Sequence, residues 1–291
     1  RAVSCLAGLS AAAVLLTGCS TSDGPPGKGN SAGSAKPVPP PPESVAAVGD
    51  SITRGFDACS LLSDCPEVSW VTGTDARVDS LTARLSPNGG RADRGGPAKG
   101  VKSWNLARSG ASMADLPRQI DRAVAKRPEM ITILMGANDA CRTSTAAMTP
   151  VAEFRASFER SLRTVQRRLP NTRVLVGSIP DLEHLWKVGR KYPEAKQAWS
   201  FGICPSMLAR PDSKAAADQA RRAAVAQRVK RYNGVLKTSC TKFAMCIFDG
   251  GAVHRYRFTA RDLSKWDWFH PSIHGQAALA RIMYQAAFGK P

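Results

Sequence analysis

The chain has 291 residues, of which 43% are hydrophobic and 22% charged, a balance that is typical of a globular protein with one sizeable core or two small ones. Its 41 Lys and Arg against 23 Asp and Glu give a formal charge of +18, which either attracts acidic lipid headgroups, cell-wall polymers or nucleic acid, or simply keeps the protein soluble. Because Cys/His finger spacing and interleaved basic and aromatic residues are absent from the sequence, nucleic acid gains no support as a partner.

The first 18 residues have the character of part of a signal peptide. Arg1 is followed by an apolar run, residues 2–16, that is too short for a comfortable membrane span. The run closes with Leu16-Thr17-Gly18-Cys19, which resembles the lipobox of bacterial lipoproteins, where the cysteine is lipidated and becomes the mature N-terminus. We therefore expect export, with lipidated Cys19 holding the protein on the outer face of the cell membrane. An ordinary secretory signal cut nearby would also export the protein.

Residues 19–43 predict a disordered tether. Gly, Ser and Pro dominate this segment, and large apolar side chains are nearly absent from it. Such a composition buries nothing, so we place the folded domain in residues 44–291. The tether would hold this domain away from a membrane surface.

The first element of the predicted domain is a buried strand that ends in a serine. Residues 45–48 are four apolar residues, two of them β-branched, as in a strand of a parallel sheet. Gly49 ends the strand, and Asp50 and Ser51 follow at once, where open α/β sheets bind ligands. Ser51 is therefore a candidate nucleophile, although a serine in a turn more commonly caps a helix.

The rest of the chain alternates strands with helices. This alternation indicates an open parallel sheet with helices on both faces, a flavodoxin-like three-layer α/β/α sandwich with a five-stranded sheet. We predict strands over 103–107, 130–135, 173–177 and 243–248; helices over 76–85, 113–126, 150–169, 214–238 and 273–288; a cysteine-bearing segment over 55–71; an exposed loop over 86–100; and an irregular, aromatic-rich segment over 181–213.

Six cysteines follow Cys19, and export makes disulfides plausible. Sequence alone does not fix how six cysteines pair. Spacing suggests two local links and one that joins longer loops: Cys59–Cys65, Cys240–Cys246 and Cys141–Cys204. Because the sequence has no Cys-x-x-Cys and only four histidines, we do not expect a structural zinc site.

Three further features fall after predicted strands or before the last helix. Gly110 could present an open backbone N–H, and the side-chain amide of Asn138 could donate to an oxyanion. In Asp267-Trp268-Phe269-His270, the aspartate could hold the imidazole in one tautomer, so that His270 acts as a base. Each residue also has an ordinary interpretation, as a turn glycine, a turn asparagine or a packed histidine. Their order and their places in the predicted sheet together favour a hydrolytic site.

With Ser51, these residues resemble the four blocks of the GDSL, or SGNH, hydrolase family, which is named for Ser, Gly, Asn and His. The resemblance covers nearly the whole predicted domain and is closest to bacterial esterases similar to phospholipase B. It implies that Ser51 is the nucleophile, His270 the base and Asp267 its orienting partner. It also implies an oxyanion hole made by the backbone N–H groups of Ser51 and Gly110 and the side chain of Asn138, with no metal and no cofactor.

The function we expect is hydrolysis of acyl esters, with lipid or phospholipid as the substrate and the protein acting as a monomer. An esterase that removes acetyl groups from carbohydrate or cell-wall polymer would use the same residues. A protein of another class, a non-catalytic surface-binding lipoprotein on a degenerate hydrolase fold, is the third possibility. Chain-length preference separates the first two, and loss of a catalytic residue would mark the third.

Several neighbours of these residues have weaker assignments. We expect His274 to pack beside the site, because no glutamate follows in the pattern of a zinc-binding histidine pair. Asp139 either caps a helix or bonds to the turn that aims Asn138. Three aromatic residues are expected in the core or along an acyl pocket: Trp266, Trp268 and Phe269.

Overall fold

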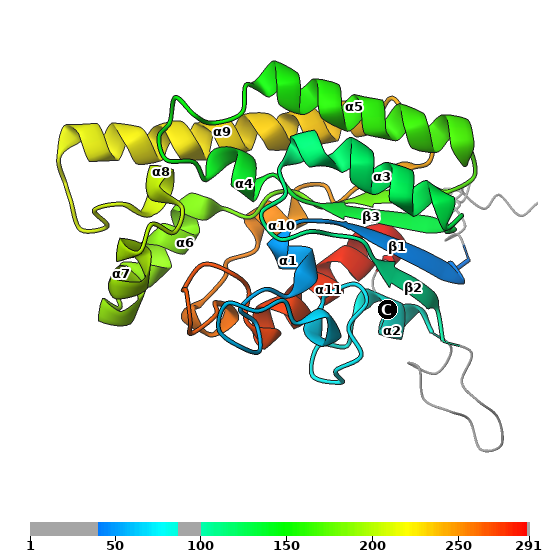
Figure 1. The fold of residues 1–291 in the computed structure, drawn as a ribbon, viewed down its shortest axis with the longest axis horizontal. Coiled ribbons are helices and arrows are strands. Elements are labelled where there is room, and N and C mark those ends of the chain that lie inside the picture. The colour runs from blue at the N-terminus through cyan, green and yellow to red at the C-terminus, as the bar shows by residue number, and fades with distance from the viewer. Residues whose placement is uncertain (1–39, 87–99, 290–291) are drawn as a thin grey trace, which may run out of the picture. The chain divides into compact units, whose positions relative to one another are not determined.

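Five parallel strands form the centre of the structure, a computed structural model (Figure 1). They pair in the order β2-β1-β3-β4-β5, so that β1 lies between β2 and β3. This is the strand order of flavodoxin-like folds, and the predicted fold class is confirmed. The strands are β1 (Ser44–Gly49), β2 (Lys102–Asn105), β3 (Met130–Leu134), β4 (Arg173–Val176) and β5 (Cys246–Phe248).

The structure describes residues 40–86 and 100–289. Several predictions fall outside these residues: the signal peptide over 1–18, lipidation of Cys19, most of the tether over 19–43, and most of the loop over 86–100.

The last residues of the predicted tether belong to the folded unit. Arg173 donates a hydrogen bond of 2.7 Å to the carbonyl of Pro40, and the backbone N–H of Lys102 donates one of 2.9 Å to Glu43. These bonds attach residues 40–43 to the start of the sheet. The boundary that composition placed at residue 44 is therefore a few residues too late.

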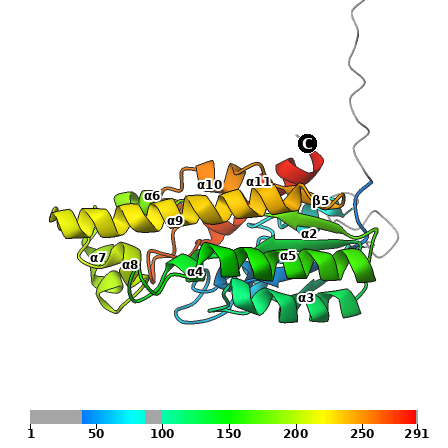
Figure 2. The same ribbon diagram turned by 90° about the horizontal axis from the view of Figure 1, so that it is seen from above.

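Helices cover both faces of the sheet. Alternate residues of β1 point to opposite faces, with Ala46 and Val48 in one core cluster and Val45 and Ala47 in the other. Figure 2 shows the helices of the first face side by side. That face carries α3 (Leu116–Ala125), α5 (Val151–Arg168) and α9 (Ala216–Cys240), and the other carries α2 (Leu81–Leu85) and α11 (Ile273–Phe288).

The segment over 181–213 is helical, and its prediction as irregular was wrong. It contains α6 (Leu182–Gly189), α7 (Pro193–Ser200) and α8 (Pro205–Leu208). Pro193 and Pro205 are the first residues of α7 and α8. At that position the N–H that proline lacks would have no hydrogen-bond partner within the helix. Asp181 caps α6 by accepting a 3.0 Å hydrogen bond from the N–H of His184. Prolines that suggest breaks in sequence therefore begin helices here.

Two other predicted elements are shorter than expected. The helix predicted over 76–85 begins only at Leu81, because Asp79 has a φ of 47° and Ser80 is the N-cap. In the strand predicted over 243–248, a turn closed by a 3.0 Å bond from Cys246 N–H to Phe243 occupies the first residues. The remaining short helices are α1 (Ser51–Arg54), η1 (Pro66–Val68), η3 (Met113–Asp115), α4 (Ala137–Ala140), α10 (Ala252–Arg255) and η4 (Ala260–Asp262).

Three disulfides cross-link the described residues: Cys59–Cys65, Cys141–Cys204 and Cys240–Cys246. The second joins the end of α4 to the start of α8, and the third joins the end of α9 to β5. None of the helices within residues 40–86 and 100–289 combines the length and the apolar character that crossing a membrane requires.

The disulfides should differ in what they contribute to stability. Cys141 and Cys204 are 63 residues apart, whereas Cys240 and Cys246 are 6 apart. In the chain-entropy model, the longer link restricts the unfolded chain more, by about 4 kcal/mol against about 2 kcal/mol. The Cys141→Ser/Cys204→Ser variant should therefore lose more unfolding free energy in urea than Cys240→Ser/Cys246→Ser. Equal losses in the two variants would contradict this expectation.

Candidate active site

Ser51 is the first residue of α1 and lies just beyond the carboxyl end of β1, from which only Asp50 separates it. Asp50 caps this short helix by accepting a 3.0 Å hydrogen bond from the N–H of Ile52. Gly49 has a φ of 155°, and a Cβ there would lie 2.5 Å from the carbonyl oxygen of Leu134 on the neighbouring strand. Only glycine fits at this position. The sharp turn leaves Ser51 7% exposed at the edge of the sheet.

Two buried glutamines hold the turn that carries Ser51. Gln119 of α3 both accepts from the N–H of Gly49 at 2.8 Å and donates to its carbonyl at 2.9 Å. From the opposite face, Gln276 of α11 donates to the carbonyl of Ile52 at 2.8 Å. Because both glutamines are completely or almost completely buried, these bonds lie where water does not compete. The position of Ser51 is therefore fixed from both helical layers.

His270 joins Ser51 to Asp267. Its Nε2 lies 2.8 Å from Ser51 Oγ, and its Nδ1 hydrogen-bonds to Asp267 Oδ2. An ionised carboxylate can only accept, so Nδ1 carries the proton and Nε2 is free to accept from the serine hydroxyl. The imidazole is 13% exposed and the Asp267 side chain is 7% exposed. The structure thus brings together the three residues that the sequence singled out as nucleophile, base and orienting acid.

The Asp267 carboxylate is held by its own turn. Its Oδ1 accepts from the backbone N–H groups of Phe269 at 2.9 Å and His270 at 3.0 Å. Burial favours the neutral acid, but the hydrogen bond and charge of His270 with these N–H groups lower the pKa of Asp267 below 3.8. Asp267 therefore stays ionised, as a partner that orients His270 must.

The pKa of His270 is raised above its usual 6.5. Burial opposes the charged imidazolium, but the hydrogen bond and the negative charge of Asp267 outweigh burial. Asp50 and Asp57 add negative charge and act in the same direction. His270 can therefore hold a proton taken from Ser51.

Asp57 is a second buried acid beside the imidazole, and it was not among the residues singled out from the sequence. One of its carboxylate oxygens lies within 4.8 Å of ligand atoms of both Asp267 and His270. Burial, followed by the charge of Asp267, raises its pKa from 3.8 to about 6. Burial likewise raises the pKa of Asp50 from 3.8 to about 7. The charge around His270 therefore changes between about pH 6 and 7.

Gly110 follows β2 and Asn138 follows β3, the two strands that pair with β1 on either side. The loop after β2 is bonded to the end of β1 through the N–H of Arg108, which donates to Gly49 at 3.2 Å. The Asn138 amide in α4, after β3, donates to the carbonyl of Ala111 at 2.9 Å. One amide proton of Asn138 remains, and no hydrogen bond among the described residues uses the N–H of Gly110. Adjacent strands thus bring potential oxyanion donors to the edge that carries Ser51.

Asp139 bonds to the segment that follows Gly110. Its buried carboxylate accepts a 2.8 Å hydrogen bond from the N–H of Met113. It therefore ties α4, which carries Asn138, to the chain after the Gly110 turn. This contact is neither of the two roles considered from the sequence, a helix cap or a bond to the turn that aims Asn138, because its donor lies in η3.

Some neighbours lie elsewhere than expected. His274 is exposed in the first turn of α11, so the expectation that it packs beside the site was wrong. It fails because α11 begins only at Ile273, so His270 and His274 do not share a helical face. Trp268, by contrast, packs against the core as expected: it is half-buried and stacks on Tyr192 with ring centroids 4.6 Å apart. Trp266 is 38% exposed and belongs to the surface.

Two groups of potential metal ligands occur among the described residues. In the first, Cys59 and Cys65 lie near Glu67, but their sulfurs are bonded to each other and offer no thiolate. The second is Asp57 with Asp267 and His270. There, the hydrogen bond to Asp267 already uses Nδ1 of His270, and Ser51 faces Nε2. These contacts fit a proton-transfer chain better than a metal centre.

A hydroxyl, an imidazole and a carboxylate in this order can activate the hydroxyl as a nucleophile. The imidazole takes the hydroxyl proton as the oxygen attacks an electrophilic carbon, and the carboxylate stabilises the imidazolium. Donors on the two flanking loops could bind negative charge that develops on the electrophile. The chemistry that the geometry allows is therefore transfer of an acyl group to Ser51.

A comparison with models of protein families agrees with this chemistry. A model of the GDSL-like lipase/acylhydrolase family matches residues 45–283. No curated protein matches the chain.

Similar solved structures include three hydrolases. An extracellular lipase from Streptomyces rimosus is 18% identical, with 80% of this chain and 94% of that chain covered and a TM-score of 0.44. A psychrotrophic esterase from Pseudoalteromonas sp. is 14% identical, with 84% and 96% covered and a TM-score of 0.46. A family 3 carbohydrate esterase from Clostridium thermocellum is 15% identical, with 83% and 93% covered and a TM-score of 0.46.

Replacing Asp57 should lower the pKa of His270. In the Asp57→Asn variant, the amide keeps an oxygen for the N–H of Leu62 but carries no charge, so the imidazolium loses one of its stabilising anions. Histidine NMR of this variant should show His270 titrating at lower pH than in the unmodified chain. Asp121→Asn, which removes a carboxylate that is 63% exposed on α3, is the matched control and should leave His270 unchanged. An unshifted His270 in Asp57→Asn would contradict the assignment.

Proposed function

The chain belongs to the GDSL-like lipase/acylhydrolase family, whose model matches residues 45–283, and on that premise we propose that it is a serine esterase that hydrolyses carboxylic acyl esters. The observation that carries the proposal is the 2.8 Å contact between Ser51 Oγ and His270 Nε2, with Asp267 bonded to the other ring nitrogen. All three side chains have the hydrogen-bond roles that nucleophilic catalysis requires.

In the proposed first step, Ser51 Oγ attacks the ester carbonyl carbon as His270 Nε2 takes its proton. The carbonyl oxygen becomes an oxyanion, which the N–H groups of Ser51 and Gly110 and the amide of Asn138 would bind. The intermediate collapses by breaking the bond to the alcohol oxygen, which receives the proton from His270. An ester of Ser51 with the acyl group remains.

In the second step, water attacks the acyl carbon of this ester and gives its proton to His270. Collapse of the second tetrahedral intermediate breaks the bond to Ser51 Oγ, which regains the proton, and the carboxylic acid leaves. Asp267 stays ionised throughout and stabilises the imidazolium in both steps. Neither step needs a metal or a redox cofactor.

We propose lipid or phospholipid as the source of the acyl group. Apolar rings surround the base, since the ring of Phe56 lies 5.0 Å and that of Phe269 lies 5.1 Å from the imidazole. An acyl chain entering the site would contact these rings, which favours substrates with a chain longer than acetyl. An acetyl esterase acting on carbohydrate or cell-wall polymer is the alternative, and activity on acetyl esters alone would favour it.

We also propose that the protein is exported and acts as a monomer. The three disulfides support export, because such bonds persist in oxidising compartments. Anchoring by lipidated Cys19 is the proposed mode of attachment to the membrane. Mass spectrometry of the mature N-terminus tests it, since a diacylglyceryl group on Cys19 would distinguish a lipoprotein from a simply secreted protein.

Ser51→Ala should abolish ester hydrolysis without unfolding the protein. The substitution removes a single oxygen atom at the edge of the sheet, whereas loss of the nucleophile costs about 10³-fold or more in kcat. A fluorophosphonate probe followed by peptide mapping should label Ser51 in the unmodified chain and nothing in the variant. p-Nitrophenyl esters from acetate to palmitate give the chain-length profile. Unchanged turnover in Ser51→Ala would refute the proposed function.

Asn138→Ala should lower kcat by about 100-fold and change KM little. An oxyanion donor acts in the transition state rather than on bound substrate, so its loss appears mainly in kcat. The variant also loses the 2.9 Å bond to Ala111, so thermal unfolding should be measured in parallel to show that the fold persists. A rise in KM at constant kcat would contradict the role of Asn138.

A further inference from the structure

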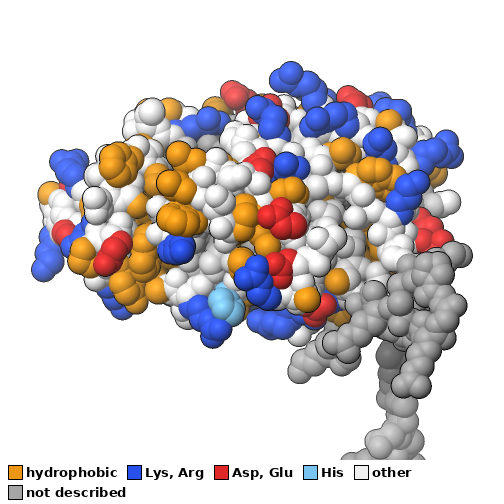
Figure 3. Space-filling view, turned by 60° about the horizontal axis from the view of Figure 1, so that its bottom comes forward, with side chains coloured by type: hydrophobic (Ala, Val, Ile, Leu, Met, Phe, Trp, Pro, Cys, Tyr) orange, Lys and Arg blue, Asp and Glu red, His pale blue; other side chains and the backbone are white. Residues whose placement is uncertain are grey.

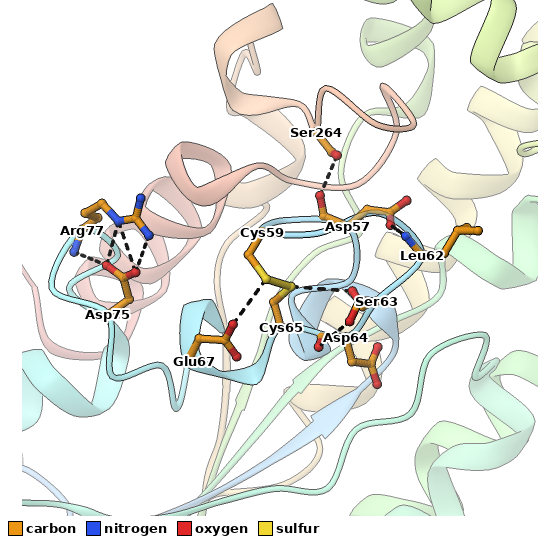
Figure 4. The surroundings of a disulfide bond; sticks show 10 residues. All are labelled: Asp57, Cys59, Leu62, Ser63, Asp64, Cys65, Glu67, Asp75, Arg77 and Ser264. Carbon is orange, nitrogen blue, oxygen red and sulfur yellow. Dashed lines mark hydrogen bonds and ion pairs between the residues drawn. A yellow bond between two sulfur atoms is a disulfide. The ribbon is translucent and has the colours of Figure 1, made fainter.

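The loop from Asp57 to Cys65 runs beside the residues of the proposed active site. At its start, the Asp57 carboxylate lies within 4.8 Å of ligand atoms of Asp267 and His270. At its end, Asp64 accepts a hydrogen bond from Ser109, the neighbour of Gly110, and pairs with Arg54 at 2.9 Å. The loop, whose disulfide and neighbouring side chains are drawn in Figure 4, therefore has contacts near His270 at its start and near Gly110 at its end.

The tip of this loop exposes two adjacent leucines. Leu61 is 53% exposed and Leu62 is 76% exposed, whereas Leu81 and Leu116 in the core are fully buried. Single apolar residues on a surface are ordinary, but two together at the border of an active site are not. We refer to Leu61 and Leu62 as the leucine tip.

The leucine tip is held in its exposed position. Leu62 has a φ of 52°, which is unusual for a residue with a side chain, and its N–H donates to the Asp57 carboxylate. The N–H of Asp57 donates to the carbonyl of Ser63 at 2.9 Å, and the Cys59–Cys65 disulfide closes the loop. Figure 4 shows the Leu62 side chain pointing away from the disulfide and from Asp57. These hydrogen bonds and the disulfide therefore fix the backbone of the loop with both leucines exposed.

A basic hollow of about 530 Å³ lies beside the first residues of the loop that carries the leucine tip. Asp57 and Cys59 form the wall that the hollow shares with the loop. Its cationic side chains come from two other segments and are exposed: Arg77, Arg261 and Lys265. In the view of Figure 3, hydrophobic side chains gather over one half of the surface, and Lys and Arg side chains lie among and around them.

Trp266 borders the same hollow. It is 38% exposed, and the ammonium of Lys265 lies 4.5 Å from its ring centroid. A tryptophan beside a lysine is a combination that suits the boundary between lipid headgroups and acyl chains, because the ring has an apolar body and the ammonium reaches phosphate. Trp266 also directly precedes Asp267, so the hollow borders the catalytic turn.

We propose that the leucine tip and the basic hollow together form a docking surface for lipid aggregates that carry anionic headgroups. This inference rests on the proposed esterase function and assigns it a substrate presented at a lipid surface. The leucines would enter the acyl region while the cations contact the phosphates, as in other proteins that bind the plane of a membrane. A net charge of +18 adds long-range attraction to the same surface.

Vesicle binding tests the proposal directly. The full chain should carry Cys19→Ser in every variant, so that lipidation does not contribute, and Ser51→Ala, so that vesicles are not consumed. Binding should be strong on vesicles with phosphatidylglycerol and weaker on pure phosphatidylcholine. Leu61→Ser/Leu62→Ser should weaken binding by about 10-fold or more, because the inserted apolar area is lost.

The matched control is Met245→Ser. Met245 is 37% exposed and directly precedes β5, so it lies at the amino ends of the strands, whereas the site lies at their carboxyl ends. Its loss should therefore not change binding. Arg261→Ala/Lys265→Ala should reduce the preference for anionic vesicles and the dependence of binding on salt. Unchanged binding of the leucine variant, or equal weakening by Met245→Ser, would overturn the proposal.

Activity separates failure of docking from failure of the esterase function. With Ser51 restored, Leu61→Ser/Leu62→Ser should hydrolyse soluble p-nitrophenyl acetate at the rate of the unmodified chain but hydrolyse esters in anionic vesicles about 10-fold more slowly. Loss of both activities to the same extent would show that the loop supports the site rather than a lipid surface. No hydrolysis of any ester by the unmodified chain would refute the esterase function, while vesicle binding would still report on docking.

Discussion

The hydrogen bond between Ser51 and His270 depends on how two distant segments are held against one sheet. Ser51 follows the central strand β1, and His270 precedes the last helix, α11. Gln119 fixes the backbone just before Ser51, and Gln276 of α11 fixes the backbone just after it. The same helix that carries Gln276 continues from the turn that holds His270. A buried amide therefore links the backbone beside Ser51 to the helix that follows the turn of His270.

Acidic side chains gather at the site of a strongly basic protein. Asp50, Asp57 and Asp267 all lie buried near one imidazole, while the chain as a whole has a charge of +18. Burial raises the pKa of both Asp50 and Asp57, and a neighbouring negative charge adds to this rise, that of Asp139 at Asp50 and that of Asp267 at Asp57. Asp267 remains the ionised member because its turn supplies two N–H donors in addition to His270. Local hydrogen bonding thus decides which acid keeps its charge.

The parts of the fold that sequence predicted are those set by local pattern. Apolar, β-branched runs indicated the strands, and the order of Ser51, Gly110, Asn138 and His270 after successive elements indicated the edge where they meet. The helices over 181–213 were missed because a proline can either interrupt a helix or occupy its first position, and the sequence pattern does not distinguish the two cases. Gln119 had a signal, as a polar residue between the buried Leu116 and Ile120 on one helical face. Asp57 had none, because its burial depends on contacts with the distant turn around Ser264, whose hydroxyl donates to its carbonyl at 2.6 Å.

The Cys59–Cys65 link lies only a few residues beyond the end of α1, in a segment that pairs with no strand of the described sheet. Residues inside it can change without altering the hydrogen bonds of the sheet or the two glutamines that fix the nucleophile. The disulfide thus closes a small loop of its own, separate from the backbone that the two glutamines hold around Ser51. Substitutions inside this loop would therefore change the surface beside the site while the contact between Ser51 and His270 is kept.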